Sequence, residues 1–176
     1  RLKAVADEQA ALGRVATLVA SGAPPEKVFA VVAEEVAGCL DLPLVSVIHF
    51  EAGGTAVHVG VWGRQNPFPV GTSWQLDEHG AAGRVYRSGQ SARVDYAHVP
   101  GPIAARLAGQ AGIRSAVAVP ITVNGRPWGA MMALSTALDT QPASTEARLA
   151  SFTDLIATAI ANADAREELK LLADEQ

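Results

Sequence analysis

The sequence predicts an α+β domain in which an antiparallel sheet of about six strands is flanked by helices, with a long helix at each end. Gly53-Gly54 and Asn124-Gly125 each separate two apolar segments, and this pattern is typical of β-hairpins. Amphipathic stripes at both ends of the chain indicate the long helices. Of the 176 residues, 49 % are hydrophobic and 18 % are charged, which suits one folded domain.

Five segments have the features of helices. Residues 1–21 carry apolar side chains at the spacing of an amphipathic helix, and the run Ser21-Gly22-Ala23-Pro24-Pro25 interrupts it. Because proline favours the first turn of a helix, a second helix is expected directly afterwards. Gly89 and Gly112 are expected to close two shorter helices. The expected helices span residues 1–21, 28–40, 79–88, 103–111 and 142–175.

The strands are expected on either side of the two hairpin signals and in two shorter segments between them. Asn124-Gly125 is the stronger signal, because both residues tolerate the left-handed backbone conformation that a two-residue hairpin turn requires. The expected strands span residues 44–52, 55–63, 72–76, 92–96, 114–123 and 126–134.

Two histidines lie in the first hairpin. If Gly53-Gly54 forms a two-residue loop, His49 lies directly opposite His58, with Cβ atoms about 5 Å apart. Such a pair could share a metal ion or respond to pH, because two imidazolium ions so close would repel each other. The sequence shows no third ligand, so no metal site is predicted, and an ordinary, partly exposed pair is the alternative.

Composition excludes several classes of function. The net charge is −4 without a basic stripe, so neither nucleic-acid binding nor contact with an anionic membrane is indicated. No apolar run approaches the ~20 residues that span a bilayer. Cys39 is the single cysteine, which fits a reducing, cytoplasmic location. The sequence contains no catalytic motif of a hydrolase, a kinase or a metalloprotease, so this chain is not expected to be an enzyme.

A short string occurs near both ends of the chain. Residues 2–9 and 169–176 both read L-K-x-x-A-D-E-Q. A unit whose last residues repeat its first ones is typical of one link in a tandem array, and chance similarity between two helical ends is the alternative. The chain begins with Arg1, which also indicates a fragment.

Several motifs together resemble the GAF-domain family. Ser115–Ile121, the turn Asn124-Gly125 and Trp128–Leu134 resemble the paired central strands of that family. Gly80–Gln90 resembles its conserved helix, and Phe152–Ala163 resembles its terminal helix. The order and spacing of the motifs carry the resemblance. It implies a GAF/PAS-like fold over residues 1–165, with residues 166–176 as a linker helix that leads to a following module.

The resemblance is greatest to GAF domains of actinobacterial sensor histidine kinases. It implies a regulatory domain of a two-component system that senses a small molecule, dimerises, or does both. The alternatives are a ligand-free dimerisation spacer, a GAF domain of a transcription regulator or other signalling enzyme, and a small enzyme of this fold. The lone Cys39 argues against the enzyme.

Aromatic and polar residues lie in segments that wall the pocket in GAF relatives, and they are candidates for binding a small molecule of unknown identity. Phe68 and Arg93 belong to the same segments. The pocket candidates are Trp62, Trp74, His79, Tyr86, Tyr96, His98, Arg106 and Arg114.

The sequence argues against three cofactors that GAF relatives bind. The signature of the cyclic-nucleotide-binding members is broken at residues 137–141 and after Phe152. The loop at residues 107–112 has no histidine for haem, and His98 would need a shifted loop. A bilin is not expected, because Cys39 lies in a helix far from the position of the bilin-binding cysteine.

The last helix is expected to serve two contacts. Its expected N-cap is Ser144 or Thr145, and a stripe that includes Leu149 and Phe152 would face the sheet. A second stripe continues past the end of the domain and would pair two copies in a coiled coil, with a polar residue that sets the register. The candidates for this homodimer interface are Leu155, Asn162, Leu169 and Leu172.

Overall fold

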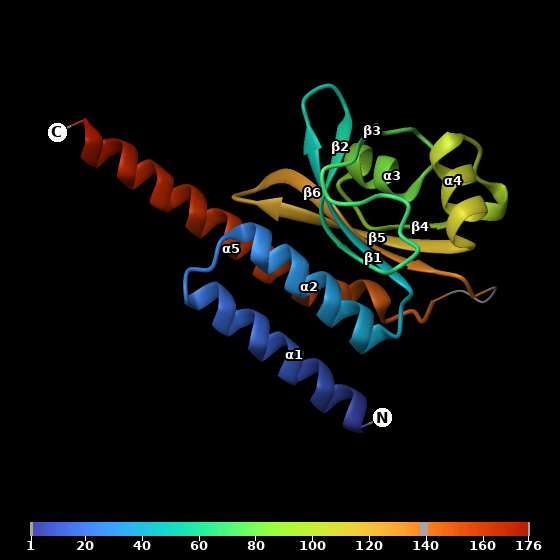
Figure 1. The fold of residues 1–176 in the computed structure, drawn as a ribbon, viewed down its shortest axis with the longest axis horizontal. Helices are drawn as coiled ribbons and strands as arrows, with labels where there is room; N and C mark the ends of the chain where they lie inside the picture. Colours follow the sequence, from blue (N-terminus) through green and yellow to red (C-terminus); the bar gives the residue numbers. More distant parts are fainter. Residues whose placement is uncertain (1, 138–140, 176) are drawn as a thin grey trace.

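The computed structural model describes residues 2–137 and 141–175 and has the predicted α+β architecture. One antiparallel sheet of six strands, in the order β3-β2-β1-β6-β5-β4, lies between two layers of helices (Figure 1). Residues 138–140 lie outside the described residues, and they belong to the stretch compared with the cyclic-nucleotide signature. Gln176, the last residue of the second L-K-x-x-A-D-E-Q string, also lies outside them.

Each predicted helix and strand is present, with ends that differ by a few residues. The strands are β1 (Leu44–Glu51), β2 (Thr55–Trp62), β3 (Ser73–Gln75), β4 (Ala92–Asp95), β5 (Ser115–Val123) and β6 (Arg126–Ser135). The helices are α1 (Leu2–Ala20), α2 (Pro25–Leu40), α3 (Ala81–Ser88), α4 (Pro102–Ala111) and α5 (Thr145–Asp174). A short 3-10 helix, η1 (Tyr96–His98), was not predicted.

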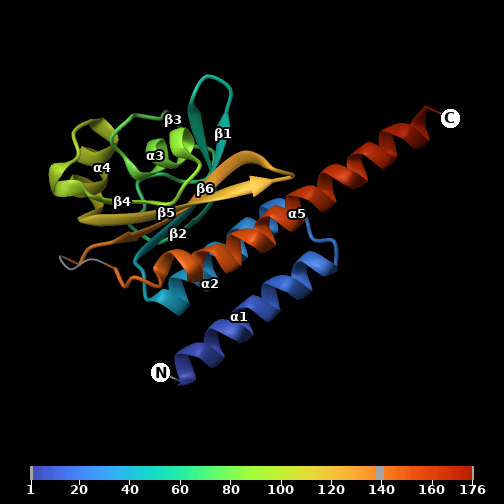
Figure 2. The same cartoon turned by 180° about the vertical axis from the view of Figure 1, so that it is seen from behind.

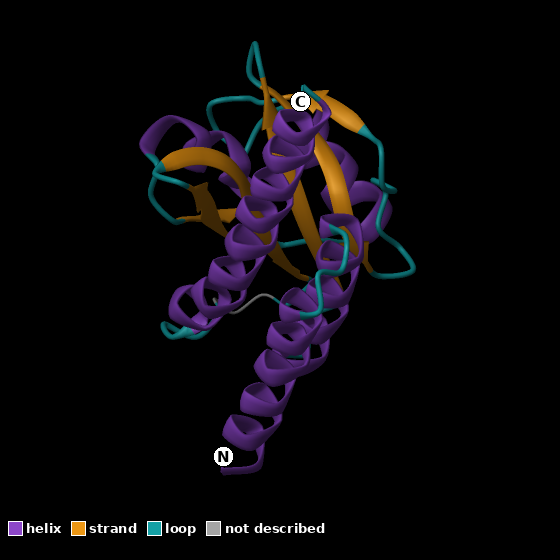
Figure 3. Cartoon of the chain, turned by 90° about the vertical axis from the view of Figure 1, so that its left-hand side faces the viewer, coloured by secondary structure: helices purple, strands orange, loops and turns teal. Residues whose placement is uncertain are grey.

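Helices α1, α2 and α5 form the layer on one face of the sheet (Figure 3). Helix α1 is the outermost and runs parallel to α5, as Figures 1 and 2 show from opposite sides. Two contacts hold this pair: Arg148 and Glu8 form an ion pair at 2.6 Å, and Arg166 donates a hydrogen bond to the carbonyl of Gly22 at 3.2 Å. Ala11 and Val15 of α1 are fully buried in this layer.

The central strands are buried on both faces, so successive side chains enter different clusters. In β6, Met131 and Ala133 join the helical layer, whereas Met132 and Leu134 face α3 and α4. Strand β5 divides its side chains in the same way. Successive side chains of a strand point to opposite faces of the sheet, so each of these strands packs against both layers of helices.

The second hairpin forms as predicted. Val123 pairs with Arg126, and the two residues between them, Asn124 and Gly125, both have a positive φ, of 50° and 76°. This is the left-handed geometry of a two-residue turn whose twist matches that of the strands.

The first hairpin differs from the prediction. Glu51 pairs with Thr55, so the turn holds three residues, and Val59 forms a bulge that shifts the register between Val47 and Ile48. Because the turn has three residues instead of two, His49 pairs with Val57 instead of His58. Since a shift of one residue turns a side chain to the other face of the sheet, the two histidines lie on opposite faces and cannot share a metal ion.

Helices α3 and α4 end at the glycines that the sequence predicts. The predicted N-cap of α5, in contrast, forms no hydrogen bond through its side chain. Gly89 and Gly112 are left-handed C-caps of α3 and α4. Ser144 is the N-cap residue of α5, yet its hydroxyl makes no capping hydrogen bond. Arg93 instead binds Glu146 through two nitrogens and donates to the carbonyls of Gln141 and Pro142.

Helix α5 has a packed part and a projecting part. Leu149, Phe152 and Ile156 are fully buried against the sheet, as the first stripe predicts. The 30-residue helix then continues beyond the rest of the domain (Figure 1), and its side chains from residue 164 onward are exposed. Among the described residues, no helix combines the length and apolar character needed to cross a membrane.

Gly60 permits the close approach of α2 to the sheet, because a Cβ there would lie 2.8 Å from both Cβ and O of Phe29. Gly60→Ala is expected to destabilise the fold by about 1–3 kcal/mol through overpacking. Gly13→Ala on exposed α1 is the control, since a Cβ there meets nothing within 4 Å, and it should stabilise the helix. Urea unfolding measures both, and equal stability of the two variants would contradict this account.

Candidate functional site

A small cavity lies between the sheet and the layer that contains α3 and α4. It measures about 20 Å³, which is room for roughly one water molecule. Its walls are mostly apolar and come from β1, β2, β6, α3, α4 and the segments that connect them. The lining residues are Ser46, His58, Phe68, Trp74, Asp77, residues 80–83, Tyr96, Ile103, Ala104, Leu107, Met132 and Leu134.

His58 is the most unusual group in this wall. It is 2 % exposed, and its Nε2 accepts a hydrogen bond from the indole N–H of Trp74 at 2.9 Å. An accepting Nε2 carries no proton, so the neutral imidazole has its proton on Nδ1. That buried Nδ1 has no hydrogen-bond partner among the described residues. Burial lowers the pKa of His58 to about 4, which keeps the ring neutral at physiological pH.

Tyr96 and Asp77 supply the other polar groups at one end of the cavity. Tyr96 is buried, and burial together with the charge of Asp77 raises the pKa of its phenol. The Asp77 Oδ1 accepts hydrogen bonds from the backbone N–H groups of His79 and Gly80, at 2.9 and 2.6 Å. A Cβ at Gly83 would lie 1.6 Å from the Asp77 carbonyl oxygen, so only glycine lets α3 approach this loop.

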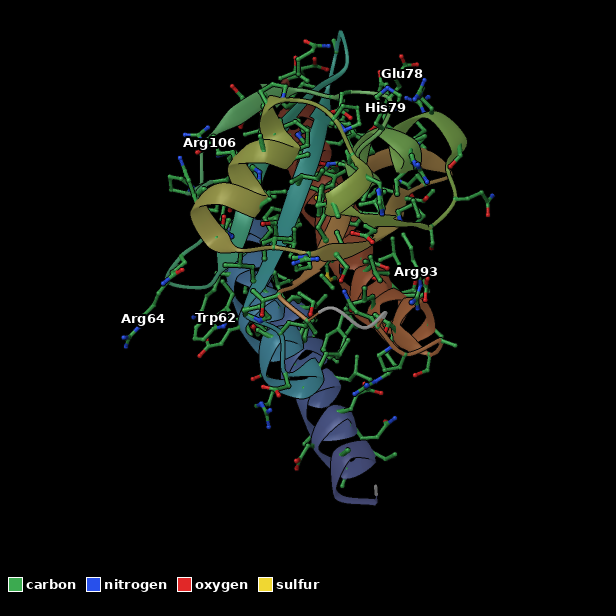
Figure 4. The ribbon with its side chains drawn as sticks, turned by 90° about the vertical axis from the view of Figure 1, so that its right-hand side faces the viewer. Trp62, Arg64, Glu78, His79, Arg93 and Arg106 are labelled. Atoms are coloured by element: carbon green, nitrogen blue, oxygen red, sulfur yellow. The ribbon has the colours of Figure 1, made fainter. Side chains whose placement is uncertain are left out.

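Phe68 forms another part of the cavity wall. Its backbone N–H donates to the side chain of Asn66 at 2.9 Å, and Asn66 donates to Ser46 at 3.3 Å, which ties the loop to β1. The ring of Phe68 stacks on His58 with centroids 5.1 Å apart. The guanidinium of Arg106 lies 5.1 Å from the Phe68 centroid, but Arg106 points outward from α4 in Figure 4 and does not line the cavity.

The structure brings together only part of the predicted pocket set. Trp74 and Tyr96 line the cavity, and Arg106 covers it from outside. Trp62 is 43 % exposed at the end of β2 and points away from the cavity (Figure 4). His79 and Tyr86 line a separate open groove above α3.

The remaining predicted residues lie elsewhere. His98 is exposed at the end of η1, and Arg114 lies at the start of β5 beside Arg93 in a different hollow. Arg93 lies far from the cavity, at the N-terminus of α5 (Figure 4), where its hydrogen bonds lower the pKa of Glu146. Arg93 therefore ties β4 to the start of α5 and does not line the cavity.

Sequence reasoning missed the polar side of the cavity. His58 was considered only as a partner of His49, and Asp77 and Ser46 were not considered at all. The alternation of β2 could have found His58, because Ala56 and His58 lie two residues apart and both face the α3 layer.

Neither histidine joins a metal-binding cluster. His49 stacks on Trp128 at 4.3 Å on the helical side of the sheet, and burial lowers its pKa. Within residues 2–137 and 141–175, no three His, Cys, Asp or Glu side chains gather as metal ligands would. Cys39 is half-buried on α2, across the sheet from the cavity, and burial raises the pKa of its thiol.

Comparison of the sequence with protein families finds one match, to the GAF domain, over residues 24–163. A comparison with curated proteins finds no match.

Solved structures with the same fold come from proteins of different activity, and identities of 17–19 % establish likeness of fold alone. The phycoerythrobilin-bound GAF domain of a cyanobacterial phytochrome has a TM-score of 0.75 at 18 % identity, covering 91 % of this chain and 97 % of that one. The GAF domain of a phosphoenolpyruvate-protein phosphotransferase from Coxiella burnetii has a TM-score of 0.76 at 17 %, covering 92 % and 97 %. Free methionine-R-sulfoxide reductase from Neisseria meningitidis has a TM-score of 0.72 at 19 %, covering 90 % and 91 %.

The first of these similarities contradicts the prediction about cofactors. The sequence argument excluded a bilin because Cys39 lies in the wrong helix, but a GAF domain that holds a bilin shares the fold of this chain over most of its length. That exclusion was wrong, because the position of one cysteine does not decide what the fold can accommodate.

The buried His58 makes folding depend on pH. The unfolded chain protonates this imidazole below its ordinary value of 6.5, whereas the folded protein keeps it neutral down to about 4. Unfolding therefore takes up a proton in this window, and stability falls as the pH drops. The expected loss between pH 7.5 and 5 is about 2 kcal/mol.

Urea unfolding at both pH values measures this loss. His58→Phe should remove most of it, whereas His98→Asn, at an exposed position, should leave it in place. An equal loss in the wild type and in His58→Phe would contradict the assignment.

Proposed function

The chain belongs to the GAF-domain family, and we propose that it is a sensor domain that binds a small molecule in the cavity beneath α3 and α4. One observation carries this proposal: the Nδ1–H of His58, deeply buried in the cavity wall, has no hydrogen-bond partner among the residues that the structure describes. An unsatisfied buried donor costs about 1–3 kcal/mol, so a group that accepts its hydrogen bond would be favoured there. An apolar pocket with a few placed polar groups is the usual form of a ligand site.

The central strands supply a route from the cavity to the terminal helices. Met132 and Leu134 line the cavity, and their neighbours Met131 and Ala133 lie in the cluster that includes Phe152 of α5. A ligand that moves the cavity side of β6 also changes the packing of α5, because the interior is close-packed. We propose that binding is transmitted in this way.

The projecting end of α5 is the proposed output. Leu169 and Leu172 are 66 % and 53 % exposed, and Asn162 is exposed on the same helix, whereas Leu155 is half-buried against the domain. Exposed leucines three residues apart on a helix favour pairing with a second helix. We therefore propose a homodimer through α5 in which Leu155 has a mainly intramolecular role.

The proposed parent is a histidine kinase of a two-component system. The support is the resemblance of the motifs to such proteins and a terminal helix that projects from the domain, in which residues 166–176 would act as the linker. The GAF domains of similar fold belong to a phytochrome and to a phosphotransferase, so the fold itself is compatible with several parents.

A ligand-free dimerisation spacer is the second candidate. The observation that favours it is the size of the cavity, about 20 Å³, which is far less than the volume of a metabolite. In this case only the helical layer and the projecting end of α5 would carry the function.

Native mass spectrometry and absorbance of the protein purified from cells separate these candidates. We expect a small molecule to accompany the wild type and to be lost in Ala104→Leu, because Ala104 is buried and lines the cavity. Ala105→Leu, exposed on the next residue of α4, is the control and should retain it. A wild type that carries no molecule under any growth condition would favour the spacer.

The proposed dimer can be tested at its leucines. Replacing Leu169 and Leu172 by lysine should raise the dimer dissociation constant by at least about tenfold, because two apolar side chains leave the interface. Glu167→Lys changes the net charge by the same amount without removing an apolar group, and it should have a smaller effect. Sedimentation equilibrium gives both constants. A wild type that stays monomeric at high concentration would rule out this interface.

A further inference from the structure

One polar group in the wall of the cavity, the imidazole of His58, is a neutral hydrogen-bond donor. Trp74 occupies the Nε2 of His58, so the only hydrogen-bonding group that the imidazole can offer to a guest is Nδ1–H. Phe68 stacks on the ring and helps to hold its orientation. This arrangement selects a guest with an acceptor atom, such as the oxygen of a carbonyl group.

The charges around the cavity disfavour an anion. Neither lysine nor arginine is among the described residues that line it, and Arg106 lies on the outer side of Phe68. Asp77, the one acidic residue in the wall, would repel a carboxylate or a phosphate. An ammonium group would have to leave water at a large cost, and the Asp77 Oδ1 already accepts hydrogen bonds from two backbone N–H groups.

The remaining walls favour an apolar guest. Ile103, Leu107 and Ala104 of α4 face Met132 and Leu134 of β6 across the cavity. Removing apolar surface from water contributes about 25 cal/mol per Å², so an apolar body would supply most of the affinity.

Helix α4 decides how much space is available. It contributes Ile103, Ala104 and Leu107 to the cavity wall, and it lies between Gly101 and Gly112, which have φ of 116° and 66°. Because glycine adopts many backbone conformations at little cost, these two positions can act as hinges.

From these observations we infer that the cavity binds a small, uncharged, largely apolar molecule with one hydrogen-bond acceptor, of the class of a ketone, whose oxygen accepts from the Nδ1–H of His58. This inference rests on the proposed ligand-binding function. The acceptor atom of the guest lies in the existing cavity, and its apolar part pushes α4 away from the sheet.

Three probes of similar size test the inference on the intact chain. Acetophenone has an apolar ring and a carbonyl group, ethylbenzene lacks the acceptor, and benzoate carries a negative charge. We expect acetophenone to bind at least about tenfold more tightly than either of the others, since one hydrogen bond in an apolar site contributes about that ratio. Its binding should also shift the NMR signal of the His58 Nδ1–H.

Two variants test whether the Nδ1–H of His58 causes the preference for acetophenone over ethylbenzene. His58→Phe keeps an aromatic ring beside Phe68 but has no donor, and it should bind acetophenone and ethylbenzene equally. His49→Phe is the matched control, because this histidine lies in the neighbouring strand on the opposite face. It should keep the tenfold preference. If His58→Phe does not fold, the wild-type ratio of acetophenone to ethylbenzene and the His58 signal still decide the question.

Several results would overturn the inference: equal binding of acetophenone and ethylbenzene to the wild type, tightest binding of benzoate, or no binding of any probe. These outcomes are distinguishable from failure of the proposed function. A charged molecule that is carried from the cell and lost in Ala104→Leu would overturn the ligand class but leave the sensor role in place. A protein that binds no probe and carries no cellular molecule would contradict both proposals.

Discussion

The rest of this structure depends on a sheet that is buried on both of its faces. Strands β1, β5 and β6 send alternate side chains into the helical layer and into the layer of α3 and α4, so neither layer can move without the other. This constraint gives the proposed sensor its route of transmission, since Met131 and Met132 are neighbours in sequence but belong to different clusters. It also explains why the cavity is small: both sides of the sheet are packed almost completely.

The length of the first turn shows how much one residue can decide. Its third residue sets Ile48 opposite His58 and His49 opposite Val57, so that His58 enters the cavity wall beside Trp74 while His49 stacks on Trp128 on the other face. The bulge at Val59 shifts the register only farther from the turn, between Ile48 and Val47. Burial then lowers the pKa of His58, and its Nδ1 finds no hydrogen-bond partner within the described part of the chain. Buried polar groups almost always have hydrogen-bond partners, so an unpaired one that destabilises the fold favours the binding of a molecule that supplies the partner.

Helix α5 packs against the domain in its first half and projects beyond it in its second half. Its first half is held by the sheet, and the ion pair between Arg148 and Glu8 ties it to α1. The repeated string L-K-x-x-A-D-E-Q begins at Leu2, the first residue of α1, and again at Leu169, near the end of α5. These two helices run parallel (Figures 1 and 2). The described residues of the two copies therefore run in the same direction.

The sequence by itself determined the fold class, the helices and strands, and the hairpin at Asn124-Gly125, because hydrophobic periodicity and glycine conformation act over a few residues. The resemblance also made Trp74 and Tyr96 candidates for the pocket, and both line the cavity. Only the tertiary structure decided the register of the first hairpin, the orphaned nitrogen of His58 and the structural role of Arg93. These features depend on contacts between segments far apart in the chain. Arg93 and Glu146, for example, are 53 residues apart, and no local pattern could pair them.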